Sequence, residues 1–202
     1  MRNINLPVSL IILSFLYGCT AGDVQMGRTA LMNNKPDVAL GYFQRAAERD
    51  PNYIMNFGTF REGVWTYMGR AQYVTGKLPQ ARQSLERAVA SDKDDYLAKL
   101  YLGLTLARDG DRQRGLTEMQ SGLQGLHDWL DWVEIYTSYG VYWDPMRQIR
   151  NEIKTNLAIV SSKEIDWQKL IAGGEDIGNK MEEEIDRSRT DEIESHFKQR
   201  SD

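Results

Sequence analysis

Apolar positions recur at helical spacing over most of the chain. Met146, Ile149, Ile153, Leu157 and Val160 follow one another at steps of three or four residues, which place them on one face of an α-helix. Runs that alternate apolar and polar residues between turn residues are hard to find, and the 202 residues include only five prolines. The pattern therefore predicts an all-α protein.

A repeat of 34 residues is visible in the middle of the chain. Small residues recur at fixed offsets, with one large apolar residue between them. The matched positions are Gly69 and Gly103, Gly76 and Gly110, Ala81 and Gly115, Leu85 and Met119, and Ala88 and Gly122. An earlier copy has Gly27, Ala39, Phe43, Ala46 and Pro51 at corresponding steps. Such a period is typical of stacked helical repeats, in which small residues lie where helices approach closely.

The period, the small residues and Trp65, four residues before Gly69, resemble the tetratricopeptide repeat, a pair of antiparallel helices. The resemblance covers about residues 22–127. It implies a right-handed superhelix of about three helical hairpins, with a generic helical bundle as the alternative. The interval from Gly27 to Gly69 is 42 residues, eight more than the period. We expect this excess, around residues 53–61, to lengthen the next helix by about two turns or to form a short helix before it.

The segment after the repeats is expected to cover the exposed face of the last unit. Its aromatic residues fall at steps of three and four: Trp129, Trp132, Tyr136, Tyr139 and Trp143. The series predicts one helical face packed against the third unit, with sugar or peptide binding as the alternative. Further on, Gly173-Gly174 predicts a break before a last helix with a narrow apolar stripe. We expect this last helix to be dispensable for folding of the repeats.

The N-terminus resembles a bacterial lipoprotein signal. A short charged start precedes the apolar run from Ile4 to Leu16, which is shorter than the roughly 20 residues of a membrane-spanning helix. Leu16-Tyr17-Gly18-Cys19 resembles a lipobox, although Tyr17 departs from the small residue usual there. The resemblance implies cleavage before Cys19 and a covalent lipid on this only cysteine of the chain. An ordinary secretory signal with an incidental cysteine is the alternative. Thr20, which follows Cys19, resembles an outer-membrane address, so we expect a lipid anchor facing the periplasm.

Charge and motif content narrow the function further. The net charge is −4, and residues 175–202 carry ten acidic and five basic side chains, so the rest of the mature chain is neutral. This distribution gives no electrostatic footprint for nucleic acid. No phosphate-binding loop or nucleophile–base pair is recognisable, and His127 with Asp131 is too small a set for a metal site. We therefore expect no catalytic residue, no metal, no cofactor besides the lipid, and no enzymatic activity.

The expected organisation is a signal peptide at residues 1–18, a repeat region at 19–127, a helical capping extension at 128–172 and an acidic terminal helix at 173–202. The family resemblance implies that the first helix of each unit lines a concave groove. Residues just after the repeat glycine, or one turn further on, would face that groove: Arg28, Arg70, Tyr73 and Arg108.

Arginine forks suit carboxylates, so an acidic segment or a free C-terminus is the expected ligand of this groove. Family members that bind C-terminal carboxylates use lysine and asparagine, which this chain does not reproduce. The alternative is that the arginines pair with acids of the same chain, such as Asp23 or Asp109. The acidic tail could also occupy the groove of a neighbouring molecule.

The expected function is a periplasmic scaffold, anchored in the outer membrane, that binds a protein or peptide partner. The alternative function is a transporter-associated subunit that holds a small solute among its helices. A scaffold should show an open groove with mixed polar lining, whereas a solute subunit should show a closed cavity with a few converging polar groups.

Overall fold

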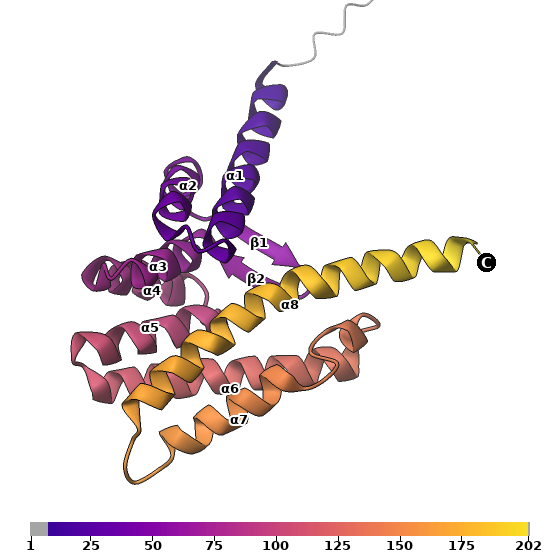
Figure 1. Ribbon diagram of the computed structural model, residues 1–202. Helices are drawn as coiled ribbons and strands as arrows, with labels where there is room; N and C mark the ends of the chain where they lie inside the picture. The colour runs from indigo at the N-terminus through magenta and orange to yellow at the C-terminus, as the bar shows by residue number, and fades with distance from the viewer. Residues whose placement is uncertain (1–7, 202) are drawn as a thin grey trace, which may run out of the picture.

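The structure is a computed structural model that describes the backbone of residues 8–201 and the side chains of residues 20–191, 193 and 194. Three antiparallel helical hairpins follow one another along the chain, as the repeat predicted (Figure 1). They are formed by α1 (Val8–Met32) and α2 (Pro36–Arg49), by α3 (Val64–Val74) and α4 (Leu78–Ser91), and by α5 (Tyr96–Asp109) and α6 (Arg112–Tyr136). The predicted all-α repeat fold is confirmed.

The repeated glycines hold each hairpin together by close contact. A Cβ atom on the glycine of the first helix would overlap a large side chain of the second helix. The three pairs are Gly27 with Phe43, Gly69 with Leu85, and Gly103 with Met119. The three large side chains are fully buried. Any larger residue at the glycine would therefore push the two helices apart.

The extra residues of the second unit form a β-hairpin, so the predicted helical extension is wrong. Strand β1 (Ile54–Phe57) pairs antiparallel with β2 (Phe60–Gly63), and α3 has only 11 residues. Gly58 begins the two-residue turn with φ of +59°, which glycine adopts readily. The glycine between Phe57 and Phe60 is thus a hairpin signal, but the helical spacing of the surrounding sequence favoured a helix.

The aromatic series after the repeats does not form one helical face. Helix α6 ends at Tyr136, where the exposed fraction of the side chain is 70%, and Trp132 is 45% exposed. The buried face of α6 is formed by Met119, Leu123, Leu126, Leu130 and Val133. Trp129 and Trp143 instead contact Phe60 of β2, with ring centroids 5.1 and 6.0 Å away. The predicted aromatic stripe is therefore wrong, and two of its members support the hairpin.

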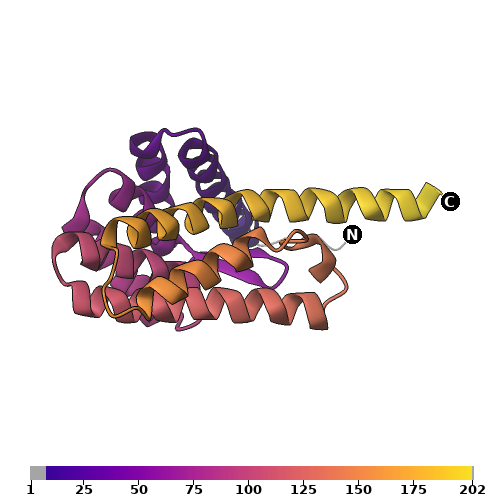
Figure 2. The same ribbon diagram turned by 60° about the horizontal axis from the view of Figure 1, so that its bottom comes forward.

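The last part of the chain folds back over the repeats. After a 3-10 turn at Gly140–Tyr142 come α7 (Gln148–Val160) and α8 (Trp167–Ser201). Helix α8 runs across the helical hairpins, and its C-terminal part extends beyond the rest of the protein (Figures 1 and 2).

The predicted break at Gly173-Gly174 is wrong, because both glycines lie inside α8. They allow close packing instead. A Cβ on Gly173 would meet the Asn156 side chain, and a Cβ on Gly174 would lie 2.9 Å from Leu104. The apolar stripe of α8, formed by Ile177, Met181 and Ile185, is completely buried. The terminal helix is therefore part of the core, contrary to its expected dispensability.

The lipoprotein prediction remains an expectation. Residues 1–7 lie outside the described residues, and the side chains of the Leu16–Cys19 motif lie outside the described side chains. Within the part that the structure describes, no helix has both the length and the apolar character needed to cross a bilayer.

Candidate partner-binding groove

The four residues predicted to face the groove do lie along one surface. Arg28 comes from α1, Arg70 and Tyr73 from α3, and Arg108 from α5, which are the first helices of the three hairpins. Each of the four contacts a carboxylate on α8. Helix α8 therefore lies in the groove of its own chain and supplies the acidic partner that the arginines were expected to bind.

Arg28 is completely buried between α1 and α8. Its Nε donates to Glu182, and its Nη2 lies 3.0 Å from Asp186 Oδ1. Gln25 accepts a third hydrogen bond at 3.2 Å, and the guanidinium lies 4.6 Å from the centre of the Phe57 ring. Arg28 is thus fully engaged within the chain.

Arg70 is also buried and bridges two carboxylates. Its Nη1 lies 2.6 Å from Glu62 on β2 and 2.6 Å from Glu182 on α8. The guanidinium also lies near the rings of Tyr67 and Tyr101, at 5.9 and 5.2 Å. Arg70 therefore joins the hairpin, α3 and α8 in one ionic network.

The network holds its two glutamates in different electrostatic states. Burial raises the pKa of Glu62 to about 7, and the attraction of Arg70 offsets only part of this effect. Burial also disfavours the Glu182 carboxylate, but Arg70 and Arg28 outweigh this effect, so its pKa is lowered. Burial opposes the charge of Arg70 too, yet Glu62 and Glu182 raise its pKa well above the ordinary value. Glu182 is consequently the permanent counter-ion of both arginines.

The outer end of the groove is less crowded. The Tyr73 hydroxyl donates to Glu175 Oε1 at 2.5 Å, and burial together with this bond raises the pKa of Tyr73. The Arg108 guanidinium lies 4.8 Å from the centre of the Tyr73 ring. Its Nη1 is 3.6 Å from Glu175 Oε1, and the side chain is 41% exposed. Arg108 thus keeps donors that face solvent.

A pocket of about 470 Å³ opens at this outer end, between α1, α3, α5 and α8. Met32 and Val74 form an exposed apolar rim, at 44% and 50% exposure. Arg108, Asn179 and Glu183 add exposed polar groups. The lining is mixed and reaches solvent, as a groove for a protein segment requires.

The alternative, that the arginines pair with acids of the same chain, is confirmed, although the acids are Glu62, Glu175, Glu182 and Asp186 and not the two named as examples. Asp23 instead contacts Arg45 and Arg49 of α2. Sequence reasoning missed Glu182, because the Glu182-Glu183-Glu184 run is typical of a solvated face. The only available signal was its position next to Met181 and three residues before Ile185 in the apolar stripe.

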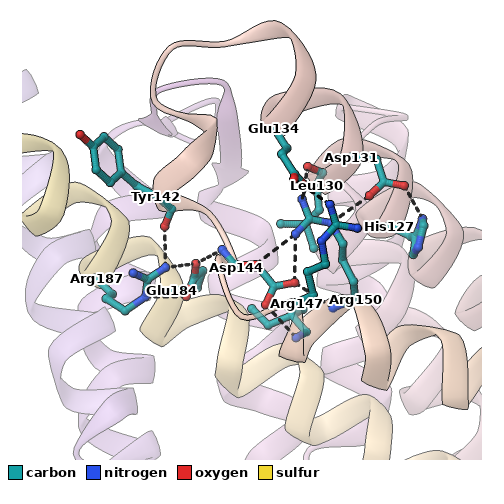
Figure 3. Close-up of polar contacts among 11 residues, drawn as sticks. His127, Leu130, Asp131, Glu134, Tyr142, Asp144, Arg147, Arg150, Glu184 and Arg187 are labelled. Carbon is teal, nitrogen blue, oxygen red and sulfur yellow. Dashed lines mark hydrogen bonds and ion pairs between the residues drawn. The ribbon is translucent and has the colours of Figure 1, made fainter.

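A second polar cluster joins α6, α7 and the segment between them (Figure 3). Arg150 is buried and donates to Asp131 at 2.9 Å, to the Leu130 carbonyl at 2.5 Å and to Asp144 at 3.2 Å. The Asp144 carboxylate also accepts from the backbone N–H groups of Ile149 and Arg150, both at 3.0 Å. These bonds cap the start of α7, so the cluster is structural.

His127 belongs to the edge of this cluster. Its Nδ1 lies 3.3 Å from Asp131 Oδ2, and Asp131 in turn contacts Arg150. No group of three or more histidine, cysteine, aspartate or glutamate side chains suited to a metal ion occurs among the described residues.

The sequence model of the tetratricopeptide repeat family matches residues 68–120. This match runs from α3 into α6 and contains two of the three glycine contacts described above. The match supports tetratricopeptide repeats over this part of the chain. No curated protein matches it. Tetratricopeptide repeats suggest a scaffold for protein–protein interaction, and the family is typically non-catalytic. Arg70, Tyr73 and Arg108 lie within the matched residues, on the first helices of their hairpins, whereas Arg28 on α1 precedes the match.

Proposed function

We propose that this tetratricopeptide repeat protein is a scaffold that binds an acidic segment of a protein partner, with a lipid on Cys19 anchoring it to the periplasmic face of the outer membrane. The partner would occupy the 470 Å³ pocket beside α8. Its carboxylate would bind Arg108, and its apolar side chains would contact Met32 and Val74.

The state of Arg108 supports this proposal most directly. Its ion pair with Glu175 is long, at 3.6 Å, and 41% of its side chain remains exposed. A guanidinium carries five donors in a planar fork, so a partner carboxylate can bind without displacing Glu175. Arg28 and Arg70 serve differently: they hold α8, which forms one wall of the pocket.

The pocket favours a scaffold over a subunit that holds a small solute. Arg108, Val74 and Asn179 are exposed along its lining, so a chain segment can enter and leave along the groove. A solute site would bury most of its ligand in a closed cavity. The open lining supports the binding of a protein segment.

Site-directed crosslinking tests the groove. A photoreactive phenylalanine analogue replaces Val74 at the rim, crosslinking is done in intact envelopes, and the attached segment is identified by mass spectrometry. A synthetic peptide of that segment is then titrated against the chain. We expect Arg108→Ala to weaken binding by about tenfold, the loss of roughly one charge-assisted hydrogen bond.

Arg82→Ala is the matched control, because Arg82 lies on α4 and pairs with Glu86 of the same helix. It should leave the affinity unchanged. Equal affinity of the parent and the Arg108→Ala variant, at low and at physiological salt, would refute binding at this pocket. A double replacement of Arg28 and Arg70 is unsuitable, since both are buried in the ionic network.

The anchor requires a separate experiment. The Leu16–Cys19 motif supports it. Cys19→Ser should leave the helical circular dichroism unchanged and move the protein from the membrane fraction to the soluble periplasm. Mass spectrometry of the N-terminal peptide should find acyl chains on the parent only. A variant that stays in the membrane fraction would show that the anchor lies elsewhere.

A further inference from the structure

The β-hairpin is additional to the repeat, and the outer edge of each of its two strands is unpaired within the described part of the chain. It spans residues 54–63, in the interval where the second unit exceeds the 34-residue period by eight residues. Among residues 8–201 the sheet has two strands, so β1 pairs with β2 on one side and with no strand of these residues on the other. An unpaired edge presents backbone N–H and C=O groups that another strand can bind.

The pairing identifies which residues of β1 face this edge. Ile54, Met55, Asn56 and Phe57 lie opposite Gly63, Glu62, Arg61 and Phe60. Just before β1, Tyr53 accepts a hydrogen bond from Val64 N at 3.0 Å, in the same register. Hydrogen-bonded pairs alternate in an antiparallel ladder, so Met55 and Phe57 bond inward to β2. The backbone groups of Ile54 and Asn56 therefore point away from β2.

An open groove of about 520 Å³ runs along this edge, between β1 and the C-terminal half of α8. Tyr53 and Tyr139 form the accessible aromatic wall, and α8 adds the exposed Ile193. Trp143 and Ile185 lie behind them and are buried. No residue of β2 lines the groove, which is therefore on the free side of the hairpin. In Figure 1 this side of β1 lies near the start of the overhanging part of α8.

Strand β1 also lacks the usual protection of an edge strand. Natural edges are blocked by charged side chains, proline, bulges or a covering element. The β1 sequence is Ile-Met-Asn-Phe, with no charge and no proline, and its register is regular. Asn56 is exposed. The Asn56 side-chain amide donates a long hydrogen bond, at 3.4 Å, to the Ile54 carbonyl, which an incoming strand would replace. No strand of the described residues pairs with this edge.

The charges in the groove indicate what the added strand carries. Arg189 is the charged residue among the groove-lining side chains, and it is exposed. It forms no ion pair with any other described residue. A carboxylate on the incoming strand would complement this guanidinium.

We propose that an extended segment of another protein adds to β1 as a third strand in this groove. Its backbone would hydrogen-bond Ile54 and Asn56, its alternate apolar side chains would contact the aromatic wall and Ile193, and an acidic side chain would bind Arg189. This site is distinct from the pocket at Arg108, because its lining shares no residue with that pocket.

The test selects peptides from a displayed library of random decapeptides on the full chain in detergent, and compares two proline variants. Asn56→Pro removes an N–H from the open edge. Arg61→Pro is the matched control, because Arg61 lies directly opposite Asn56 and presents its N–H to the other edge of the same hairpin. Thermal melts and circular dichroism establish that both variants fold alike.

We expect a family of selected peptides with alternating apolar residues and one acidic residue. A synthetic peptide of this family should bind the parent and Arg61→Pro equally. It should bind Asn56→Pro about tenfold more weakly, the loss of roughly one net hydrogen bond. Methylation of alternate backbone nitrogens of the peptide should have a similar effect, whereas methylation of the intervening nitrogens should have little. Arg189→Ala should weaken binding, and Arg189→Lys should restore part of it.

Three outcomes would overturn the proposal. Peptides that bind the parent and Asn56→Pro equally occupy another surface. If no selected peptide prefers the parent to the Asn56→Pro variant, the edge does not pair with an added strand. Self-association of the chain that Asn56→Pro abolishes, seen by sedimentation, would show that a second copy is the occupant instead.

Discussion

Replacing Glu182 should destabilise the protein far more than replacing its neighbour Glu183. Glu182 is buried between α8 and the first helices of the repeats, where it accepts from Arg28 and from Arg70. Glu182→Ala would leave two buried guanidinium groups with one counter-ion fewer. Glu183 is exposed on the same helix and is a natural control.

The expected cost follows from what each arginine retains. Breaking a buried ion pair by removing one partner costs about 3–5 kcal/mol, because the remaining charge stays desolvated. Arg28 keeps Asp186 at 3.0 Å, and Arg70 keeps Glu62 at 2.6 Å. The free energy of unfolding should therefore fall by about 3 kcal/mol, at the lower end of that range. Glu182→Gln keeps the shape and one acceptor oxygen, and should cost about 2 kcal/mol.

Urea denaturation followed by circular dichroism at the helical band measures these changes. The Glu183→Ala curve should lie within about 0.5 kcal/mol of the parent curve, as is usual for an exposed position. A Glu182→Ala curve that coincides with that of Glu183→Ala would refute the reasoning. It would mean that α8 does not lie in the groove in solution.

Three further predictions concern the network, the aromatic residues and the terminal helix. Glu62 has a folded pKa of about 7 against an ordinary value of 4.5, so the folded state binds more protons between these pH values. The free energy of unfolding should therefore decrease by about 3 kcal/mol as pH rises through this window. Urea denaturation at several pH values measures this decrease, which should be smaller in Glu62→Gln. Trp143→Ala should cost about 3–5 kcal/mol because the side chain is buried, whereas Trp132→Ala, at 45% exposure, should cost less than about 1 kcal/mol; equal melting shifts would contradict this. A chain that ends at Ala172 loses the buried stripe of α8 and should not show a cooperative melt; a melt like that of the intact chain would contradict the packing of α8.

The repeat part of the fold could be predicted because its determinants are local and periodic. Each hairpin needs a small residue opposite a large one, and the Gly69–Leu85 contact recurs at a fixed distance as Gly103–Met119. The period of 34 residues arises because this contact recurs in each unit. A helix-forming sequence with such contacts leaves few alternative arrangements.

The β-hairpin and the continuity of the terminal helix could not be predicted from the sequence pattern, for physical reasons. Strands of four residues are too short to show a period, and only Gly58 at the turn indicated them. A Gly-Gly pair such as Gly173-Gly174 predicts a break, although glycine inside a helix also permits close approach, here to Asn156 and Leu104. Local sequence does not distinguish these two uses of glycine.

The candidate site was predicted in part. The spacing from the repeat glycines located Arg28, Arg70, Tyr73 and Arg108 on one surface. The pairing of Arg28 with Glu182 spans 154 residues, and no local pattern specifies such a contact. That these arginines bind carboxylates was therefore predictable, with acids of the same chain as one alternative, while the particular acids on α8 were not.

The energetics of α8 determine how a partner can use the groove. Displacing α8 would expose the buried stripe of Ile177, Met181 and Ile185, and would leave Arg28 and Arg70 without Glu182. The exposure of apolar surface and the loss of the buried ion pairs both oppose displacement of α8. A single acidic segment has no apolar stripe that could bury this surface again. The partner proposed above would therefore bind beside α8 and use the helix as one wall of its site. Partner affinity should accordingly fall, and not rise, when α8 is loosened.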